Sequence, residues 1–370
     1  MGAVLSTGWA GFPPIADHFP PTPEAYTSLL SAFQWFPVIT IFQWVLSWHP
    51  AGKTSLQSSI LNLPGRIAWC IMEIAGPVNL IYNLSIESPS FFDLPRPNQL
   101  VAALYCIHYF NRAIISPFFS APSMSPIHVL LMLSAITFNW VNSSCIVGWL
   151  RGYSIPVPGF RTDGVASLAS PLSGGSSSQL AATLPVVGSV LFFIGMAGNI
   201  YSETSLFRMR REEADKRLAK KTDSTPTSTD TSGPSKGNKF HKVYVIPPAK
   251  GVFASILYPH YVFEWVEWTG FALAGVAVYP LSGILSSIGS DAAATVSVAP
   301  PLRPAPWVTP FAWVTDRLGL PLPLPAVLFV INAIANMLPH ARWGRRWYVE
   351  KFGEKGVAGR GAVVPGCAWM

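Results

Sequence analysis

The sequence is short of charged residues. Asp, Glu, Lys and Arg make up only 12% of its 370 residues, which is about half the share found in typical soluble domains. Half of the residues are hydrophobic, and the mean hydropathy is positive. This composition excludes an ordinary soluble enzyme and indicates an integral membrane protein.

Cysteine is also scarce, and the common nucleotide-binding motifs are missing. The four cysteines have neither the spacing of a disulfide framework nor that of a metal site, so we expect no metal. No G-x-G-x-x-G follows a strand pattern and no G-x-x-x-x-G-K-[ST] occurs, which excludes a Rossmann domain and a P-loop. A nucleotide cofactor would therefore bind between helices and loops.

The sequence contains instead a series of long apolar runs. A helix needs about 20 apolar residues to cross a bilayer; six runs approach or exceed that length, and a seventh is shorter. The predicted spans are 25–52, 66–82, 100–119, 127–149, 184–202, 261–284 and 325–338. We predict an all-α integral membrane bundle of seven transmembrane helices, formed as a single domain by residues 1–370.

The basic residues indicate the topology of this bundle. The net charge is +7, and most of the 25 lysines and arginines fall in 208–250 and 342–360. Such clustering beside apolar runs is typical of cytosolic segments, so we expect no nucleic-acid partner. We predict an N-terminal tail outside the cytosol (1–25), a partly disordered cytosolic loop (208–242), a non-cytosolic loop (285–324) and a cytosolic C-terminus.

Four of the predicted spans carry ionisable or strongly polar side chains at membrane depth. They include Glu73; Tyr105, His108, Tyr109 and Arg112; Asn199, Tyr201 and Glu203; and His260, Glu264 and Glu267. Each fits a structural role by itself, because an arginine can pair with a glutamate and an asparagine can join two helices. Buried charges on four spans are a costly way to fix packing alone. Their number favours a shared intramembrane cavity for cofactor and substrate.

The carboxyl and hydroxyl groups in these spans suit carbonyl chemistry. A glutamate in apolar surroundings can stay neutral near pH 7 and then donates a hydrogen bond. Together with a tyrosine hydroxyl, it can polarise a carbonyl and stabilise an enolate oxygen. Basic residues at the cytosolic mouth, such as Arg210 and Lys250, can meet the phosphates of a soluble cofactor or simply follow the positive-inside rule.

Five blocks of the sequence form a recognisable set. They are PGRIAWCIMEIAG (64–76), ALYCIHYFNRAIISPF (103–118), GMAGNIYSETSLFRMRR (195–211), the segment 244–275 and RRWYVEKF (345–352). With these blocks the chain resembles the steroid 5-alpha-reductase family, as a fungal-like member. The family comprises integral-membrane NADPH-dependent reductases, among them polyprenal and very-long-chain enoyl-CoA reductases. The resemblance implies NADPH as cofactor, a lipophilic substrate, and a multi-pass protein of the endoplasmic reticulum.

The resemblance also implies roles for individual residues. Glu73 and Tyr109 would hydrogen-bond the carbonyl of an α,β-unsaturated substrate such as a 3-oxo-Δ4-steroid. Hydride would pass to the β-carbon, and the enolate would be protonated at the α-carbon. The NADPH site would comprise Asn199, Glu203, Arg210, Tyr244, His260, Glu264 and Tyr348, and the substrate site Arg112, Glu267 and Trp268.

The sequence departs from the family pattern around the cofactor. Ser120–Ser123 replaces a basic turn, Tyr201 a histidine, and Val245 a basic residue. These changes affect cofactor geometry more than carbonyl chemistry. Three alternatives stay open. They are enoyl-CoA or polyprenal reduction within the same family, a transporter or channel whose buried carboxylates relay protons or bind cations, and a membrane methyltransferase.

Overall fold

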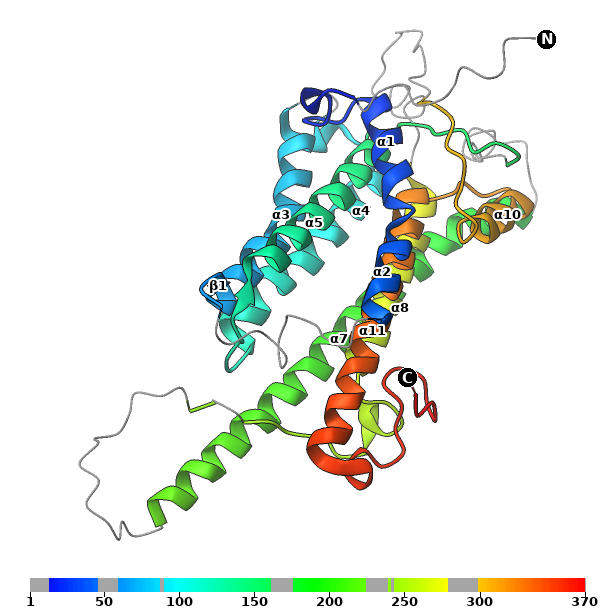
Figure 1. The fold of residues 1–370 in the computed structure, drawn as a ribbon. Coiled ribbons are helices and arrows are strands. Elements are labelled where there is room, and N and C mark those ends of the chain that lie inside the picture. Colours follow the sequence, from blue (N-terminus) through cyan, green and yellow to red (C-terminus); the bar gives the residue numbers. More distant parts are fainter. Residues whose placement is uncertain are drawn as a thin grey trace, which may run out of the picture.

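The protein folds into a bundle of helices, described by a computed structural model (Figure 1). The structure describes residues 13–45, 59–86, 90–160, 176–223, 239–240, 243–278 and 299–369. Two short strands, β1 (Asn62–Leu63) and β2 (Ile127–His128), pair antiparallel. They tie the start of helix α3 (Gly65–Ile86) to the start of helix α5 (Val129–Leu150).

Within the described residues, five stretches of helix are long and apolar enough to cross a membrane. They are α1 with α2 (Pro23–Phe33 and Phe36–Val45), α3, α5, α7 (Ser176–Asp223) and α11 (Leu324–Val357). They coincide with five of the seven predicted spans and support a multi-pass membrane protein. Residues 46–52 of the first predicted span lie outside the described residues. Thr22 caps the start of α1, because its Oγ1 accepts a hydrogen bond from the Ala25 N–H at 3.3 Å.

The count of seven spans is not confirmed, because the predicted third and sixth spans contain shorter α-helices. Helix α4 (Arg96–Phe110) has 15 residues and passes directly into a π-helix, η4 (Asn111–Ser120). Helix α8 (Pro259–Ala274) has 16 residues and continues as a 3-10 turn, η6 (Gly275–Ala277). Residues 279–284 of the predicted sixth span lie outside the described part of the chain.

Helix α7 is much longer than the predicted fifth span. It continues through the first part of the segment 208–242, which we predicted to be a loop. Ion pairs between residues four apart stabilise this extension. Arg208 Nε lies 4.0 Å from Glu212 Oε1, and Arg217 Nε lies 2.8 Å from Glu213 Oε1. Most of the remaining loop lies outside the described residues.

Other segments that we predicted to be connections or tails also contain helix. Helix α10 (Thr309–Leu318) lies inside the predicted loop 285–324. Helix α11 continues past residue 338 into the basic C-terminal segment. In the predicted N-terminal tail, Ile15–Asp17 form the 3-10 turn η1, and residues 1–12 lie outside the description. Figure 1 shows the C-terminal parts of α7 and α11 extending toward the same end of the bundle.

Close helix packing holds the centre of the bundle together. Helix α3 packs on α5, and α7 packs on α8. Glycines allow α7 and α8 to approach each other closely. A Cβ atom at Gly195 would lie 2.3 Å from the Glu267 backbone nitrogen, and one at Gly270 would lie 2.4 Å from that of Phe192. The Trp268 side chain, which is 1% exposed, lies in the hydrophobic core at this depth.

Candidate active site

Arg112 connects three helical elements at membrane depth. Its Nη1 donates to Glu203 Oε1 at 2.8 Å, and its Nε lies 3.7 Å from Glu73 Oε1. The Trp69 ring centroid lies 4.8 Å from the guanidinium carbon, and the indole Nε1 donates to the Arg112 carbonyl at 3.1 Å. This cluster joins α3, η4 and α7, so three of the four polar spans do meet. It places the predicted substrate residue Arg112 between two carboxylates.

The predicted catalytic residues Glu73 and Tyr109 both lie beside Asn139, which was not among the predicted site residues. Tyr109 on α4, which is 3% exposed, donates its hydroxyl hydrogen to Asn139 Oδ1 at 2.9 Å. Asn139 Nδ2 donates to the Met72 carbonyl at 2.6 Å. The Asn139 side chain also interacts with the carboxylate of the next residue on α3, Glu73. Glu73 and Tyr109 therefore flank one amide of α5.

Asn139 belongs to a polar stripe on a span that carries no acidic or basic group. Asn142, Ser143 and Ser144 follow it on α5, and all three are 0% exposed. Asn79 on α3 donates to the hydroxyl oxygens of Ser143 and Ser144 at 2.9 and 3.0 Å. Amides and hydroxyls in an apolar run indicate the face of a membrane helix that contacts its neighbours, and this signal was available in the sequence.

His108 and Glu267 form a second buried pair, between α4 and α8. His108 Nδ1 lies 2.8 Å from Glu267 Oε1, and Glu267 is 1% exposed. The centroids of the Trp268 and Tyr109 rings lie 4.4 and 5.1 Å from that of the imidazole. The predicted substrate residues Glu267 and Trp268 are therefore neighbours of the predicted catalytic tyrosine.

Asn199 joins the predicted cofactor residues of α7 and α8. Its Nδ2 donates to the His260 carbonyl at 3.0 Å and to Glu264 Oε2 at 3.2 Å. Glu203 follows Asn199 by one helical turn on α7 and contacts Arg112. Four of the predicted cofactor residues thus lie along the contact between α7 and α8.

The other three predicted cofactor residues lie nearer the basic end of the bundle. Arg210 donates to three backbone carbonyls, each at 3.2 Å, those of Ser123, Phe240 and Val243. The Tyr244 ring lies 5.0 Å from the Trp347 ring, and Tyr348 is 4% exposed. The guanidinium of Arg210 therefore ties α7 to two loops.

Arginines from other elements donate hydrogen bonds to the backbone of the segment Ser120–Ser123. Arg211 on α7 donates to the Ser120 carbonyl, and Arg66 on α3 donates to the Ala121 carbonyl at 2.8 Å. Arg210 binds the end of the same segment. The arginines of α3 and α7 therefore place cationic side chains beside this segment.

The C-terminal segment folds back onto the residues before α8. Arg360, which is 3% exposed, donates to the carbonyls of Pro247 and Phe253 at 2.8 and 3.2 Å. The Tyr258 N–H donates to the Ala362 carbonyl at 2.9 Å. Burial lowers the pKa of the Arg360 guanidinium and raises the pKa of the Tyr258 hydroxyl well above its usual range. At pH 7 the tyrosine is therefore neutral.

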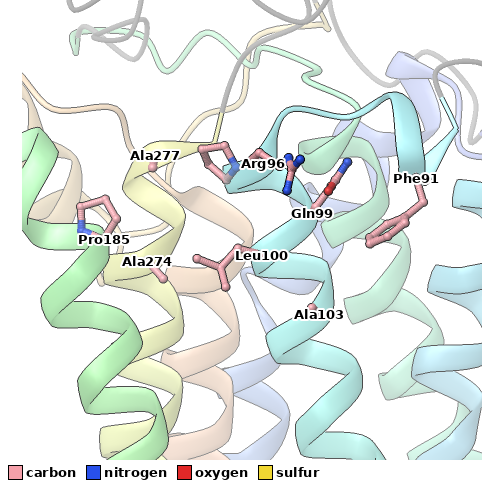
Figure 2. Close-up of a pocket in the computed structure, with 9 residues that line it drawn as sticks. Phe91, Arg96, Gln99, Leu100, Ala103, Pro185, Ala274 and Ala277 are labelled. Carbon is pink, nitrogen blue, oxygen red and sulfur yellow. The ribbon is translucent and has the colours of Figure 1, made fainter.

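An open groove lies at the other end of α4 and α8 (Figure 2). Its volume is about 540 Å³, and its lining is mostly apolar: Phe91, Arg96, Pro97, Gln99, Leu100, Ala103, Pro185, Ala274 and Ala277. Ala103 precedes His108 by five residues and Ala274 follows Trp268 by six, a rise of about 8–9 Å along the helices. None of the predicted site residues lines this groove, so a common cavity for cofactor and substrate stays a prediction.

Comparison with known proteins identifies distant relatives over most of the chain. No family model matches the sequence. An uncharacterized protein of Schizosaccharomyces pombe is 26% identical over 359 residues, 92% of this chain and 97% of that protein. The steroid 5-alpha-reductase DET2 of Arabidopsis thaliana is 23% identical over 321 residues, 85% of this chain and 86% of that protein.

A mammalian relative agrees with this result over a shorter stretch. The 3-oxo-5-alpha-steroid 4-dehydrogenase 1 of Bos taurus is 23% identical over 230 residues, 62% of this chain and 71% of that protein. Together with the apolar helices, these relatives indicate a multi-pass membrane oxidoreductase that acts on CH–CH groups. At the level of the family, the homology supports a steroid 5-alpha-reductase-like enzyme that reduces the C=C bond of an enone.

Proposed function

We propose that the protein catalyses the NADPH-dependent reduction of a C=C bond conjugated to a carbonyl in a lipophilic substrate, such as a 3-oxo-Δ4-steroid. The observation that carries this proposal is the meeting of Glu73 and Tyr109, from two helices, at the Asn139 amide inside an apolar bundle. Two hydrogen-bond donors that converge in a dry site suit an oxygen on which negative charge develops.

Glu73 and Tyr109 have complementary tasks in this reaction. With substrate bound, the Tyr109 hydroxyl would turn its hydrogen from Asn139 Oδ1 to the substrate carbonyl oxygen, and a neutral Glu73 carboxyl would donate to the same oxygen. Both would stabilise the enolate when hydride reaches the β-carbon, and protonation of the α-carbon would then complete the reduction. Arg112 makes its shortest contact with Glu203 at 2.8 Å, against 3.7 Å for Glu73. Glu203 therefore has the stronger electrostatic interaction with Arg112. The weaker interaction of Glu73 supports its role as a protonated carboxyl. Trp268 and the His108–Glu267 pair form the wall beside Tyr109.

The polar groups between α7 and α8 fit the nicotinamide half of NADPH. The Asn199 amide and the Glu264 and Glu203 carboxylates are the group types that bind a carboxamide and ribose hydroxyls. NADPH supplies the hydride when bound. Arg210 fits a phosphate less well, because its guanidinium donates to three carbonyls. Lys250 and Arg346 are exposed, which leaves their charged ends accessible to a phosphate.

The charge distribution supports an orientation for the protein. The basic ends of α7 and α11 point toward the same end of the bundle (Figure 1), and basic segments stay on the cytosolic side of a membrane. We propose a cytosolic C-terminus in the endoplasmic reticulum, where a soluble NADPH pool reaches this end of the bundle.

The test is turnover of purified protein with NADPH and a panel of a 3-oxo-Δ4-steroid, a polyprenal and a long-chain enoyl-CoA, with products identified by mass spectrometry. Glu73→Gln and Tyr109→Phe should each lower turnover by about 100-fold, the loss expected for one oxyanion donor. Tyr201→Phe is the matched control, because Tyr201 is 59% exposed. Unchanged turnover in both site variants would refute the carbonyl clamp.

The panel also decides between substrates and between classes of function. Preferred reduction of the enoyl-CoA or the polyprenal would assign those substrates while keeping the clamp. Failure to oxidise NADPH with any acceptor, in folded protein, would favour a transporter whose buried carboxylates carry protons.

A further inference from the structure

One end of the groove in Figure 2 is positively charged. Arg96, the first residue of α4, is exposed and is the only charged side chain among the described residues that line the groove. It forms no ion pair with a described residue. The nearest acidic residue in the sequence, Asp93, instead accepts two hydrogen bonds from Ser90, at 2.7 and 3.0 Å. Pro95 offers no side-chain cap at the start of α4, so the positive end of this helix stays available to an anion.

The rest of the groove is apolar and opens toward the surface of the bundle. Its wall includes small side chains on two helices, Ala103 on α4 and Ala274 on α8, together with Pro185 on α7. Leu100 also lines the groove and is 40% exposed, and Val186, beside Pro185, is 65% exposed. Lipid tails are as apolar as such side chains. An acyl chain can therefore enter the groove from the membrane along an apolar surface.

Buried aromatic side chains separate the groove from the candidate active site. Trp268 is 1% exposed, and Tyr105 and Phe271 are 0% exposed. The centroid of the Phe271 ring lies 5.5 Å from that of Trp268 and 6.3 Å from that of Tyr105. Along α4 and α8, these rings lie between the groove and Tyr109. A molecule in the groove does not reach the Tyr109 hydroxyl in this structure, so the groove suits a ligand other than the reacting substrate.

We infer that the groove binds one membrane phospholipid, with its phosphate on Arg96 and one acyl chain along Leu100, Ala103 and Ala274. Arginine binds phosphate through charge-assisted hydrogen bonds, and the start of α4 adds its N–H groups and its dipole. The volume of about 540 Å³ is typical of a site for a small molecule. None of the described lining residues is acidic, so none repels the phosphate. The inference does not depend on the proposed reduction.

The experiment counts the lipids bound to the whole chain in detergent by native mass spectrometry. Two probes carry the same acyl chains: dioleoyl phosphatidylglycerol has a phosphate, and dioleoylglycerol has none. The wild type should bind one phosphatidylglycerol at least about 10-fold more tightly than one dioleoylglycerol, because only the former makes a charge-assisted hydrogen bond with Arg96. Equal affinities for the two probes would overturn the inference.

Two variants test the two parts of the site separately. Arg96→Gln should lower the affinity for phosphatidylglycerol to that for dioleoylglycerol and leave the latter unchanged. Because Arg96 is exposed, this variant should keep its fold, which thermal unfolding checks. Ala103→Phe should weaken the binding of both probes by about 10-fold, because the ring occupies the space of the acyl chain. Unchanged binding of both probes by Ala103→Phe would contradict the assignment of the groove.

Arg317→Gln is the matched control. Arg317 is an exposed arginine on α10 and does not line the groove, so this variant should bind both probes as the wild type does. An equal loss in Arg317→Gln and Arg96→Gln would mean that surface charge alone attracts the phospholipid. Displacement of phosphatidylglycerol by a 3-oxo-Δ4-steroid, with a raised KM for that steroid in Ala103→Phe, would assign the groove to substrate instead. Since lipid counting needs no turnover, failure of the proposed reduction would not affect this test.

Discussion

Removing the Arg112 guanidinium should destabilise the bundle, chiefly by leaving the Glu203 carboxylate without its cation. Arg112→Met keeps most of the side chain's volume and leaves Glu203 and Glu73 without their shared cation. Breaking a buried ion pair by removing one partner costs about 3–5 kcal/mol. The three side chains are 14–17% exposed, so water screens part of that cost, and we expect a loss of about 3 kcal/mol, at the lower end of that range.

The two distances predict which second substitution restores stability. Arg112 lies 2.8 Å from Glu203 and 3.7 Å from Glu73, so the uncompensated charge is chiefly that of Glu203. Glu203→Gln in the Arg112→Met background should recover about 2 kcal/mol, and Glu73→Gln should recover less.

The assay is the free energy of unfolding of detergent-purified protein, measured by denaturant titration for the wild type, the single variants and the two double variants. An exposed ion pair on α7, Arg208 with Glu212, provides the control, since such pairs contribute under about 1 kcal/mol. Wild-type stability in Arg112→Met, or better rescue by Glu73→Gln than by Glu203→Gln, would refute the assignment of Arg112 as the tie between α3, η4 and α7.

Three further outcomes test the packing. Gly195→Val should prevent the close contact of α7 with α8 and lower the midpoint of thermal unfolding by several degrees. The control Ala197→Val, at an exposed position, should leave the midpoint unchanged. Equal midpoints for the two variants would contradict the close contact. His108→Ala should cost about 3 kcal/mol by leaving Glu267 unpaired, and adding Glu267→Gln should recover most of it in the same titration. Thr22→Ala should cost about 1 kcal/mol as the loss of an N-cap, and no cost would mean that α1 begins without it.

Much of the fold follows from apolar runs alone. Five predicted spans coincide with long helices because each combines sufficient length with few charges. The runs at 100–119 and 261–284 are also largely apolar, but α4 changes to a π-helix after Phe110 and α8 ends at Ala274. Hydropathy indicates the length of an apolar run, but it does not indicate where regular α-helical hydrogen bonding ends within that run.

The extension of α7 shows a second limit of composition. Charged residues after Arg208 indicate a segment in water, and a segment in water is easily taken for a loop. Glu212 and Glu213, however, each have a basic partner four residues away, which favours helix. Spacing, and not charge content, carried the relevant information.

The ionisable residues of the candidate site were predicted from the sequence, whereas the neutral Asn139 was not. Glu73, Arg112 and Glu203 meet because charges at membrane depth need partners. Asn139 has no charge, and an amide in an apolar helix can serve as a simple helix–helix contact. Its place beside Tyr109 depends on the rotation of α5 against α3 and α4, which only the packed structure specifies.

The 48 residues of α7 form one continuous rod about 70 Å long, anchored at two levels. Arg210 donates hydrogen bonds to backbone carbonyls of two loops, and Glu203, two turns earlier on α7, contacts Arg112. The helix between these two contacts is unbroken, with no loop between Glu203 and Arg210. A displacement of α7 would therefore move both contacts together, the one with the loops and the one with Arg112.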